Sequence, residues 1–170
     1  WREALVRLIG YQPQEPRLVE GTIRENLVYG LTDLPSDAAI DAVLREAHLG
    51  ALLEKKEEKL DAGVGERGGG LSGGERQRLA FARILLREPG VLILDELTSA
   101  LDLATERVIL DGLASLKGKK TIIFITHRLR SAAVADRVLV LDQGRIVEEG
   151  TFDELMARGG FFSALSRSQQ

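Results

Sequence analysis

The chain has 170 residues, 44% of them hydrophobic and 29% charged, which is the size and composition of one globular domain. Its net charge of -3 gives no basic bias, so nucleic acid is not an expected partner. The lack of cysteine excludes disulfides and thiolate metal sites. No apolar run approaches the roughly 20 residues that span a bilayer, so we expect a membrane role to depend on a partner or on a further segment.

A strand followed by a proline-rich turn is expected at the start of the chain. The aliphatic segment Leu5–Tyr11 indicates the strand. The two prolines of Gln12-Pro13-Gln14-Glu15-Pro16 must then interrupt regular structure. Taken alone, this segment indicates a turn with exposed glutamines.

Three short helices are expected before residue 60. The first begins at a capping box formed by Thr22 and Glu25, and the second begins after Ser36 and ends at Gly50. The apolar face of the second helix consists of Ala39, Ile40, Val43, Leu44 and Ala47. The third, Ala51–Glu58, carries a run of charges that is expected to form a solvated face.

A glycine-rich loop, Gly63–Gly70, leads into a capped helix. This loop lacks the Gly-Lys-Ser/Thr ending of a phosphate-binding loop. Ser72 and Glu75 have the spacing of a capping box, and an apolar series follows them as far as Pro89-Gly90. Gly73-Gly74 weakens the first turn but lets a large anion approach the N–H groups at the positive end of the helix dipole. The alternative is an ordinary capped helix with a flexible entry.

Two adjacent carboxylates follow the apolar run Val91–Leu94. Four consecutive aliphatic residues indicate a strand that is buried on both faces of a parallel sheet. Side chains alternate along a strand, so Asp95 and Glu96 point in different directions. One carboxylate could then hold a metal ion while the other faces a water. The alternative is a solvated strand end.

Further strands and helices are expected after residue 102. Thr105–Leu116 indicates a helix and Thr121–Thr126 a second buried strand, with His127 just past its carboxyl end. A lone histidine in such a place is usually structural. A short helical stretch is expected near Ser131–Ala135.

The end of the chain indicates a hairpin and a helical cluster. Val138–Asp142 and Arg145–Gly150 flank a Gln143-Gly144 turn, with alternation on the second arm. Thr151 begins the last helical region, with Glu154 at the position of a capping box, and the end of the chain from residue 166 is expected to be frayed. The expected apolar cluster consists of Leu155, Met156, Phe161, Phe162 and Leu165.

The capped helix and the strand with its two carboxylates together resemble the nucleotide-binding domain of ATP-binding cassette (ABC) transporters. Leu71–Arg78 matches the signature motif, Val91–Glu96 matches Walker B, and Ser99–Asp102 matches the D-loop. Residues 64–68, Val-Gly-Glu-Arg-Gly, resemble the X-loop of exporter-type ABC domains.

The resemblance extends over nearly the whole chain. Gln14 matches the Q-loop glutamine, although Gln12 leaves the register slightly open, and His127 matches the H-loop histidine. The implied fold is α/β: a P-loop NTPase-like ABC core with a mostly parallel sheet flanked by helices, and a helical subdomain over about 18–88. Residues 1–17 and 89–170 are then the RecA-like α/β core of a domain that is truncated at its N-terminal side.

Two departures from the family pattern stand out. No Gly-x-x-x-x-Gly-Lys-Ser/Thr motif (Walker A) occurs in the 170 residues. We therefore expect the isolated chain to bind ATP poorly and not to hydrolyse it. We also expect an uncovered sheet face, with marginal stability or self-association. The second departure is Leu97, where proline is usual, and it is expected to change the turn but to leave both acids in place.

The resemblance implies a composite site for ATP and Mg²⁺ in a dimer of two nucleotide-binding domains. It implies that the signature half-site, which meets the γ-phosphate of ATP bound to the partner, consists of Leu71, Ser72, Gly73, Gly74 and Glu75. Asp102 is expected to bridge the two domains.

The remaining implied roles concern hydrolysis. Asp95 is expected to hold Mg²⁺ together with Gln14, which also reaches the attacking water. Glu96 is the expected general base, and His127 contacts the γ-phosphate. The implied partner is the transmembrane domain of an exporter, which would place the chain at the cytoplasmic face of a membrane.

Two other functions stay open. One is an ABC-type ATPase that is not involved in transport, and the other is a non-catalytic module that only completes a partner's site. The acidic balance and the exporter-like X-loop count against the first. The presence of both Glu96 and His127 counts against the second.

Overall fold

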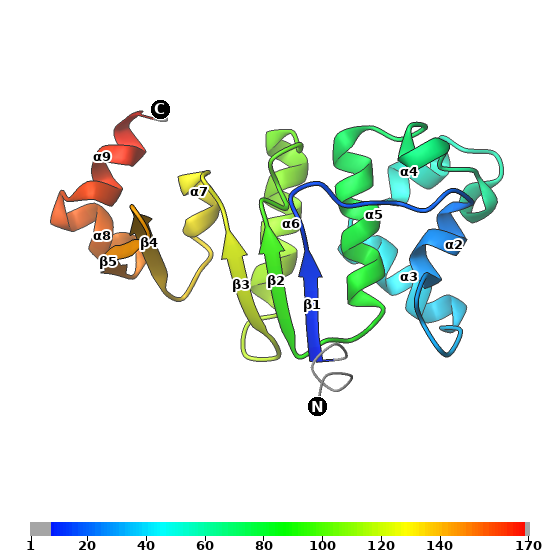
Figure 1. Cartoon of the computed structure of the whole chain (residues 1–170), viewed down its shortest axis with the longest axis horizontal. Helices are drawn as coiled ribbons and strands as arrows, with labels where there is room; N and C mark the ends of the chain where they lie inside the picture. Colours follow the sequence, from blue (N-terminus) through cyan, green and yellow to red (C-terminus); the bar gives the residue numbers. More distant parts are fainter. Residues whose placement is uncertain (1–7, 169–170) are drawn as a thin grey trace. The chain divides into compact units, whose positions relative to one another are not determined.

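The computed structural model describes residues 8–168, and the chain divides into two compact units, Trp1–Ile125 and Thr126–Gln170. The first unit contains a parallel sheet with helices α2 to α6, and the second contains a hairpin with helices α7 to α9 (Figure 1). The subdomain boundaries expected near residues 17 and 88 stay a prediction.

A parallel sheet lies at the centre of the first unit. Its described strands are β1 (Ile9–Gln12), β2 (Val91–Asp95) and β3 (Thr121–Ile125), in the order β1-β2-β3. The pairing aligns Gln12 with Leu94 and Asp95 with Ile125. The carboxyl ends of these strands therefore meet at one edge, and the expected α/β class is confirmed. Of the strand expected over Leu5–Tyr11, residues 5–7 lie outside the described part of the chain.

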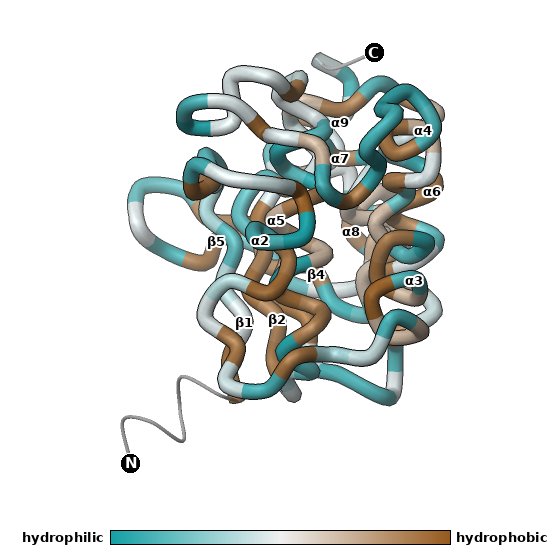
Figure 2. Tube along the Cα trace, turned by 90° about the vertical axis from the view of Figure 1, so that its right-hand side faces the viewer, coloured by the Kyte–Doolittle hydropathy of each residue, from teal (hydrophilic) through white to brown (hydrophobic). Residues whose placement is uncertain are grey.

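Of the two strands that were expected to be buried, β2 is fully buried on one face and half-buried on the other, and β3 is partly exposed, so the prediction of full burial is wrong. Leu92 and Leu94 are fully buried, and Figure 2 shows the hydrophobic character of β2, but Ile123 and Ile125 on β3 are both 49% exposed. Tyr11, which aligns with Ile93 and through it with Ile123, is also exposed. A parallel sheet is buried twice only where elements cover both of its faces. In residues 8–168, this cover is incomplete.

Helix α5 (Gly73–Leu85) packs closely on β1. A Cβ at Gly10 would lie 2.5 Å from Ile84 Cγ2 and 2.9 Å from Pro89 Cγ. The close approach of helix and strand therefore requires glycine at this position. The packing places the N-terminal turn of α5 beside the carboxyl edge of the sheet.

The expected helices between β1 and α5 are present, with shifted ends. They are α2 (Ile23–Val28), α3 (Asp37–Glu46), α4 (Gly50–Glu54) and the short 3₁₀ turns η1 (Lys59–Asp61) and η2 (Glu66–Gly68). Helix α3 ends before Gly50 because His48 adopts a left-handed φ of 53°. Helix α4 ends at Glu54, and Lys59, with a left-handed φ of 50°, begins η1.

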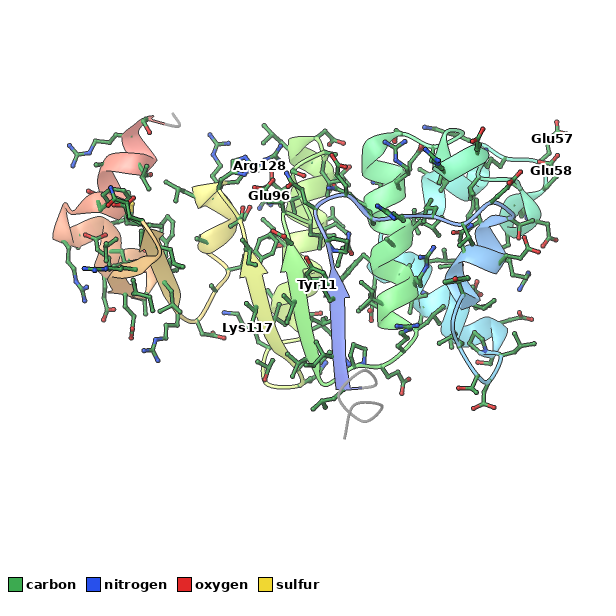
Figure 3. All side chains as sticks on the ribbon, viewed as in Figure 1. Tyr11, Glu57, Glu58, Glu96, Lys117 and Arg128 are labelled. Carbon is green, nitrogen blue, oxygen red and sulfur yellow. The ribbon has the colours of Figure 1, made fainter. Side chains whose placement is uncertain are left out.

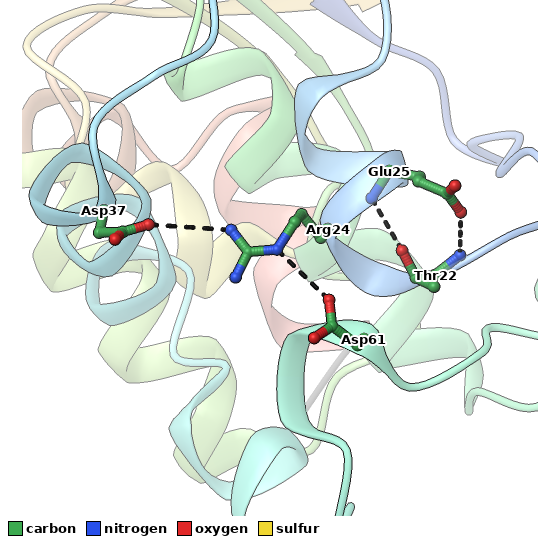
Figure 4. A network of polar contacts seen from close by, with 5 residues as sticks. All are labelled: Thr22, Arg24, Glu25, Asp37 and Asp61. Atoms are coloured by element: carbon green, nitrogen blue, oxygen red, sulfur yellow. Dashed lines mark hydrogen bonds and ion pairs between the residues drawn. The ribbon is translucent and has the colours of Figure 1, made fainter.

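Two arginines tie these helices together. Figure 4 shows Arg24 of α2 between Asp37 and Asp61, at 3.8 Å and 3.4 Å. Both pairs are exposed and add little stability. Arg83 of α5 is more buried, and its guanidinium donates to the backbone and side-chain oxygens of Asn26, at 2.7 Å each. This contact fixes α2 against α5.

Helix α6 (Leu103–Ser115) begins two residues before the expected Thr105. The reason is Asp102, which caps the helix by accepting a hydrogen bond from the Thr105 N–H. Ile109 and Leu113 are buried as expected, whereas Val108 is 40% exposed.

The second unit contains α7 (Leu129–Ala132), the hairpin of β4 (Val138–Asp142) and β5 (Arg145–Gly150), α8 (Phe152–Arg158) and α9 (Phe161–Ser168). The Gln143-Gly144 turn has positive φ angles of 47° and 75°, which are those of a two-residue hairpin turn. The core of the unit consists of Ala132, Val140, Leu155 and Phe162. The Glu148 carboxylate accepts hydrogen bonds from the Phe161 and Phe162 N–H groups at the start of α9.

The predicted details of this unit need three corrections. Phe161 and Leu165 are exposed rather than part of the apolar cluster, because α9 turns only one side towards Leu155. The second arm of the hairpin does not alternate, since Ile146 and Val147 are both exposed. Helix α9 continues to Ser168, beyond the expected start of fraying, and residues 169–170 lie outside the described part.

Candidate functional site

The turn after β2 is held in a defined conformation. The Glu96 N–H donates to the Ile125 carbonyl at 2.9 Å, and the Glu96 carbonyl accepts from the Ser99 N–H at 3.0 Å. Glu96 itself has a φ of 49°, in the left-handed region that non-glycine residues seldom adopt. The next residue, Leu97, is fully buried. The backbone therefore turns sharply at Glu96 and is anchored by the side chain of Leu97.

The structure brings Gln14 and Glu96 together. Gln14 Nε2 donates a hydrogen bond to Glu96 Oε2 at 2.7 Å. Figure 3 shows Glu96 at the end of the sheet where β2 stops. The Gln12 side chain lies away from the carboxylates. It is fully buried, and its Nε2 donates to the Gln77 carbonyl at 3.0 Å. Of the two glutamines, only Gln14 is seen to reach a carboxylate of the predicted site.

A capping box opens α5 as expected. Ser72 Oγ accepts from the Glu75 N–H at 3.2 Å, and Glu75 Oε2 accepts from the Ser72 N–H at 2.7 Å. Burial disfavours the charge on Glu75, but the hydrogen bonds with Ser72 and the charges of Lys55 and Arg78 outweigh it, and the pKa of Glu75 is lowered. The carboxylate is thus held in its ionised form at the helix start.

The two glycines of the first turn lie against the segment that follows β2. A Cβ at Gly74 would meet Leu101 Cδ2 at 2.9 Å and the Ala100 carbonyl at 3.1 Å. A Cβ at Gly73 would lie 3.4 Å from Ala100 Cβ. Close packing against Ala100 and Leu101 therefore requires glycine at position 74. The sequence indicated only that the glycine gives an anion access to the helix start. The preceding Leu71 side chain is buried.

The Asp102 carboxylate is engaged at the start of α6. Its Oδ1 accepts from the Thr105 N–H at 3.0 Å and its Oδ2 accepts from the Thr105 hydroxyl at 2.8 Å. These hydrogen bonds lower the pKa of Asp102. The side chain remains exposed, and its expected role in bridging two domains stays a prediction.

Asp95 and His127 complete the set of predicted residues. Asp95 is the half-buried last residue of β2. His127 is exposed and belongs to the second unit, so its expected position on the same sheet edge as Glu96 stays a prediction.

The oxygen atoms at this edge suit a hard cation. Asp95 and Glu96 carry carboxylates, and Gln14, which donates through Nε2 to Glu96, has a further amide oxygen. Within residues 8–168, no group of three or more His, Cys, Asp or Glu side chains could hold a metal ion. Mg²⁺ does not need such a group, since it binds one or two carboxylates and completes its shell with water and phosphate.

One buried residue of the site was missed by the sequence reasoning. Gln77 on α5 is 4% exposed and makes hydrogen bonds to three segments around the edge of the sheet. The available signal was a polar residue on the apolar stripe that Gly74, Phe81 and Ile84 form along α5. A cavity of about 430 Å³ lies beside it. The cavity is lined by Gln14, Glu15, Pro16, Gly73, Arg76, Gln77, Ser99 and Ala100.

These features define an α/β protein with its polar site at the carboxyl edge of a parallel sheet. Residues 1–99 match the family model described as ABC transporter. The chain therefore belongs to the ABC transporter family, and it corresponds to part of an exporter-type ATP-binding domain. No helix in the described part of the chain has the length and apolar character needed to cross a membrane.

Several relatives are similar over nearly the whole chain. The ATP-dependent lipid A-core flippase of Haemophilus ducreyi is 47% identical over 92% of this chain and 27% of the flippase. The beta-(1→2)glucan export ATP-binding/permease protein NdvA of Rhodopseudomonas palustris is 46% identical over 97% of this chain and 27% of NdvA. The chain thus spans about a quarter of the length of these relatives.

A solved structure agrees with the fold. The structure of a bacterial Atm1-family ABC exporter with ATP bound superimposes with a TM-score of 0.92 at 39% identity. The match covers 99% of this chain and 30% of that exporter. At this level of identity, the likeness extends to the sequence as well as the fold.

Proposed function

We propose that this chain supplies part of the ATP-hydrolysing site of an ABC exporter. The observation that carries the proposal is the 2.7 Å hydrogen bond from Gln14 Nε2 to Glu96 Oε2 at the carboxyl edge of the sheet. It joins residues that match the Q-loop and Walker B of the family to which the chain belongs. The names of the relatives, a flippase and an export protein, support outward transport rather than an ATPase without a transport role.

Glu96 is the proposed general base. A carboxylate at the end of β2 can accept a proton from the water that attacks the γ-phosphate. Gln14 orients that carboxylate through its Nε2 group, and Asp95 and Gln14 are the residues that would hold Mg²⁺. The bound Mg²⁺ would offset negative charge on the phosphates. His127 is the proposed donor to the γ-phosphate oxygens.

The signature half of the site would act on ATP bound by a second nucleotide-binding domain. Ser72, Gly73 and Gly74 stand at the positive end of the α5 dipole, where N–H groups favour an anion. Glu75 holds the Ser72 backbone through the capping box, and the buried Leu71 anchors the segment. Asp102 would contact the second domain. Two copies related by a two-fold axis would then make two equivalent sites.

The complete activity is proposed for a longer transporter that contains this chain. The 170 residues lack a Walker A motif, whose backbone nest and lysine supply much of the affinity for phosphate. The chain alone should therefore bind ATP weakly and not turn it over. A transmembrane domain would be the second partner and would hold the chain at the cytoplasmic face of a membrane.

Hydrolysis by that transporter tests the proposal. Glu96→Gln should reduce the ATPase rate by about 100-fold or more while ATP binding is retained. The matched control is Glu57→Gln, an exposed glutamate in the charge run of residues 54–58 (labelled in Figure 3), which should hydrolyse ATP at the unchanged rate. A Glu96→Gln transporter with normal turnover would refute the proposed base.

Calorimetry on the chain tests the second part of the proposal. Titration with Mg·ATP should give little or no heat of binding, for the unchanged chain and for Ser72→Arg alike. Tight binding that Ser72→Arg abolishes would show that this chain recognises ATP without a Walker A motif, and the proposed need for one would be wrong.

A further inference from the structure

The buried amide of Gln77 meets three segments that converge on the proposed site. Its Nε2 lies 3.2 Å from the Gln14 carbonyl, 3.4 Å from the Glu96 carbonyl and 3.0 Å from Ser99 Oγ. These oxygens belong to the turn after β1, the end of β2 and the D-loop segment. The two N–H bonds of one amide are thus shared among three acceptors.

The partners fix the orientation of this amide. The Ala100 N–H lies 3.3 Å from Gln77 Oε1, and an N–H group can only donate. The Gln14 and Glu96 carbonyls can only accept, so the NH₂ end must face them. A flipped amide would lose the contacts on both sides. The backbone carbonyl of Gln77 is used as well, since it accepts from Gln12 Nε2 at 3.0 Å.

Gln77 binds the backbones of the same two residues whose side chains meet. Gln14 and Glu96 are joined by their side chains at 2.7 Å, and the Gln77 amide lies against the backbone carbonyl of each. A side-chain contact of this kind depends on how well the two backbone segments are held. Gln77 stands only four residues after Gly73, so a shift of α5 would move the support of Glu96 directly.

We propose that Gln77 is a positioning residue that sets the geometry of Gln14 and Glu96. It couples this geometry to the D-loop and to the signature helix, which is helix α5 with the signature motif at its start. The inference rests on the proposed function, because it gives a role in hydrolysis to a residue that contacts no phosphate. The Gln77 amide holds the turn after β1 at the distance at which Gln14 reaches the Glu96 carboxylate. A shift of the signature helix on contact with the second nucleotide-binding domain would thereby be transmitted to Glu96, the proposed general base.

Amide hydrogen exchange of the chain tests the positioning without reference to ATP. Gln77→Met keeps the length of the side chain and removes every hydrogen bond of the amide. We expect the Ser99 and Ala100 N–H groups to exchange about tenfold faster or more in this variant, while the Leu94 N–H inside β2 keeps its rate.

Asn26→Leu is the matched control. Asn26 is also a fully buried amide, with hydrogen bonds to the Val19 and Thr22 carbonyls, but it lies on α2, and its contact with α5 is through Arg83, six residues from Gln77 towards the other end of that helix. Its loss should lower stability without a selective change at Ser99 and Ala100. Equal rates at these two positions in Gln77→Met and Asn26→Leu would overturn the inference.

A second variant separates the two sides of the amide. Gln77→Glu keeps an acceptor for the Ala100 N–H and replaces the donor that serves Gln14 and Glu96. Ala100 should then stay protected while Ser99 exchanges faster. If Gln77→Met does not fold, Gln77→Glu still tests the positioning. The Gln77 side-chain NH₂ of the unchanged chain gives a second test, because its hydrogen bonds should slow its exchange. Rapid exchange of that NH₂ would count against the hydrogen bonds themselves.

The proposed role of Gln77 in hydrolysis is tested in the complete transporter. Gln77→Met should lower kcat about tenfold or more and change KM for ATP by less than about threefold, because the groups that would bind ATP are intact. Asn26→Leu should leave both constants close to their original values. An unchanged kcat in Gln77→Met would overturn the coupling to hydrolysis. If Glu96→Gln also turned over normally, the proposed function would be at fault, and the exchange data would still report the positioning.

Discussion

Gln14 Nε2 lies 2.7 Å from Glu96 Oε2, although the two residues are 82 positions apart in the chain. They meet because β1 and β2 are parallel neighbours and because Gln12 aligns with Leu94, which leaves both residues two positions past the aligned pair. A hydrogen bond to a carboxylate is stronger than one between neutral groups. The contact therefore ties the turn after β1 to the end of β2.

A double-mutant cycle should measure the free energy of the contact between Gln14 and Glu96. Gln14→Leu removes the donor and Glu96→Leu removes the acceptor, and urea unfolding of the two single variants and the double variant gives the coupling free energy. We expect coupling of about 0.5–1.5 kcal/mol in favour of the native pair. As a control, Gln14→Leu combined with Glu57→Gln should be additive, because Glu57 lies in the exposed charge run. Additive effects of Gln14→Leu and Glu96→Leu would show that the contact is not populated in solution.

Leu97 should be sensitive to proline, the residue usual at this position in the family. Glu96 has a left-handed φ of 49°, and a following proline pushes a residue towards extended conformations. Leu97 is also fully buried, so its replacement removes packed side-chain volume. We expect Leu97→Pro to lower the free energy of unfolding by about 2–5 kcal/mol in urea. Leu97→Met keeps the volume and should cost less than about 1.5 kcal/mol. Similar stability of the proline and methionine variants would contradict the backbone argument.

The capping box of α5 should make stability depend on acid pH. The pKa of Glu75 is lowered in the folded chain, so the ionised carboxylate stabilises the fold. This contribution is fully present above the unfolded-state pKa of about 4.3 and is lost as the pH falls through the lower folded-state value. Glu75→Gln should therefore cost about 0.5–1 kcal/mol at pH 7 and much less at pH 3.

Urea unfolding at both pH values measures this difference, and Glu57→Gln is the control. Glu57 is exposed outside the helices, and its substitution should change stability little at either pH. A Glu75→Gln effect that is equally large at pH 3 would mean that the amide fails in the cap for reasons other than charge.

Local features of the fold could be predicted, because their partners are close in sequence. The capping boxes at Thr22, Ser72 and Thr151 each involve a glutamate three residues later, and all three are formed. The hairpin turn at Gln143-Gly144 is equally local. The N-cap at Asp102 is local as well, with its partner Thr105 three residues away, but it was missed.

The rest depends on contacts between distant segments. The exposure of Ile123 could not be deduced from an aliphatic run, since the run does not say which elements cover the strand. The network of Gln77 joins residues 63 and 22 positions away, and only the fold brings them within reach. The match to a known family identified Gln14 and Glu96 as candidates, and the structure supplied their contact.

The exposed face of the sheet should cause the chain to associate with itself. Tyr11, Ile123 and Ile125 are between 49% and 54% exposed, and the alignment of β1, β2 and β3 places Tyr11 and Ile123 in one row across the sheet. Contiguous apolar surface of this kind favours association, because burial removes it from water.

Sedimentation velocity should show a weight-average mass that rises with protein concentration. The double variant Ile123→Thr with Ile125→Thr should shift this rise to about tenfold higher concentration or beyond. Ile146→Thr with Val147→Thr, which alters an exposed pair on the hairpin of the second unit, serves as the matched control and should associate as the unchanged chain does. A compact monomer at every concentration would contradict the prediction and would mean that the apolar face is too small or too curved to pair.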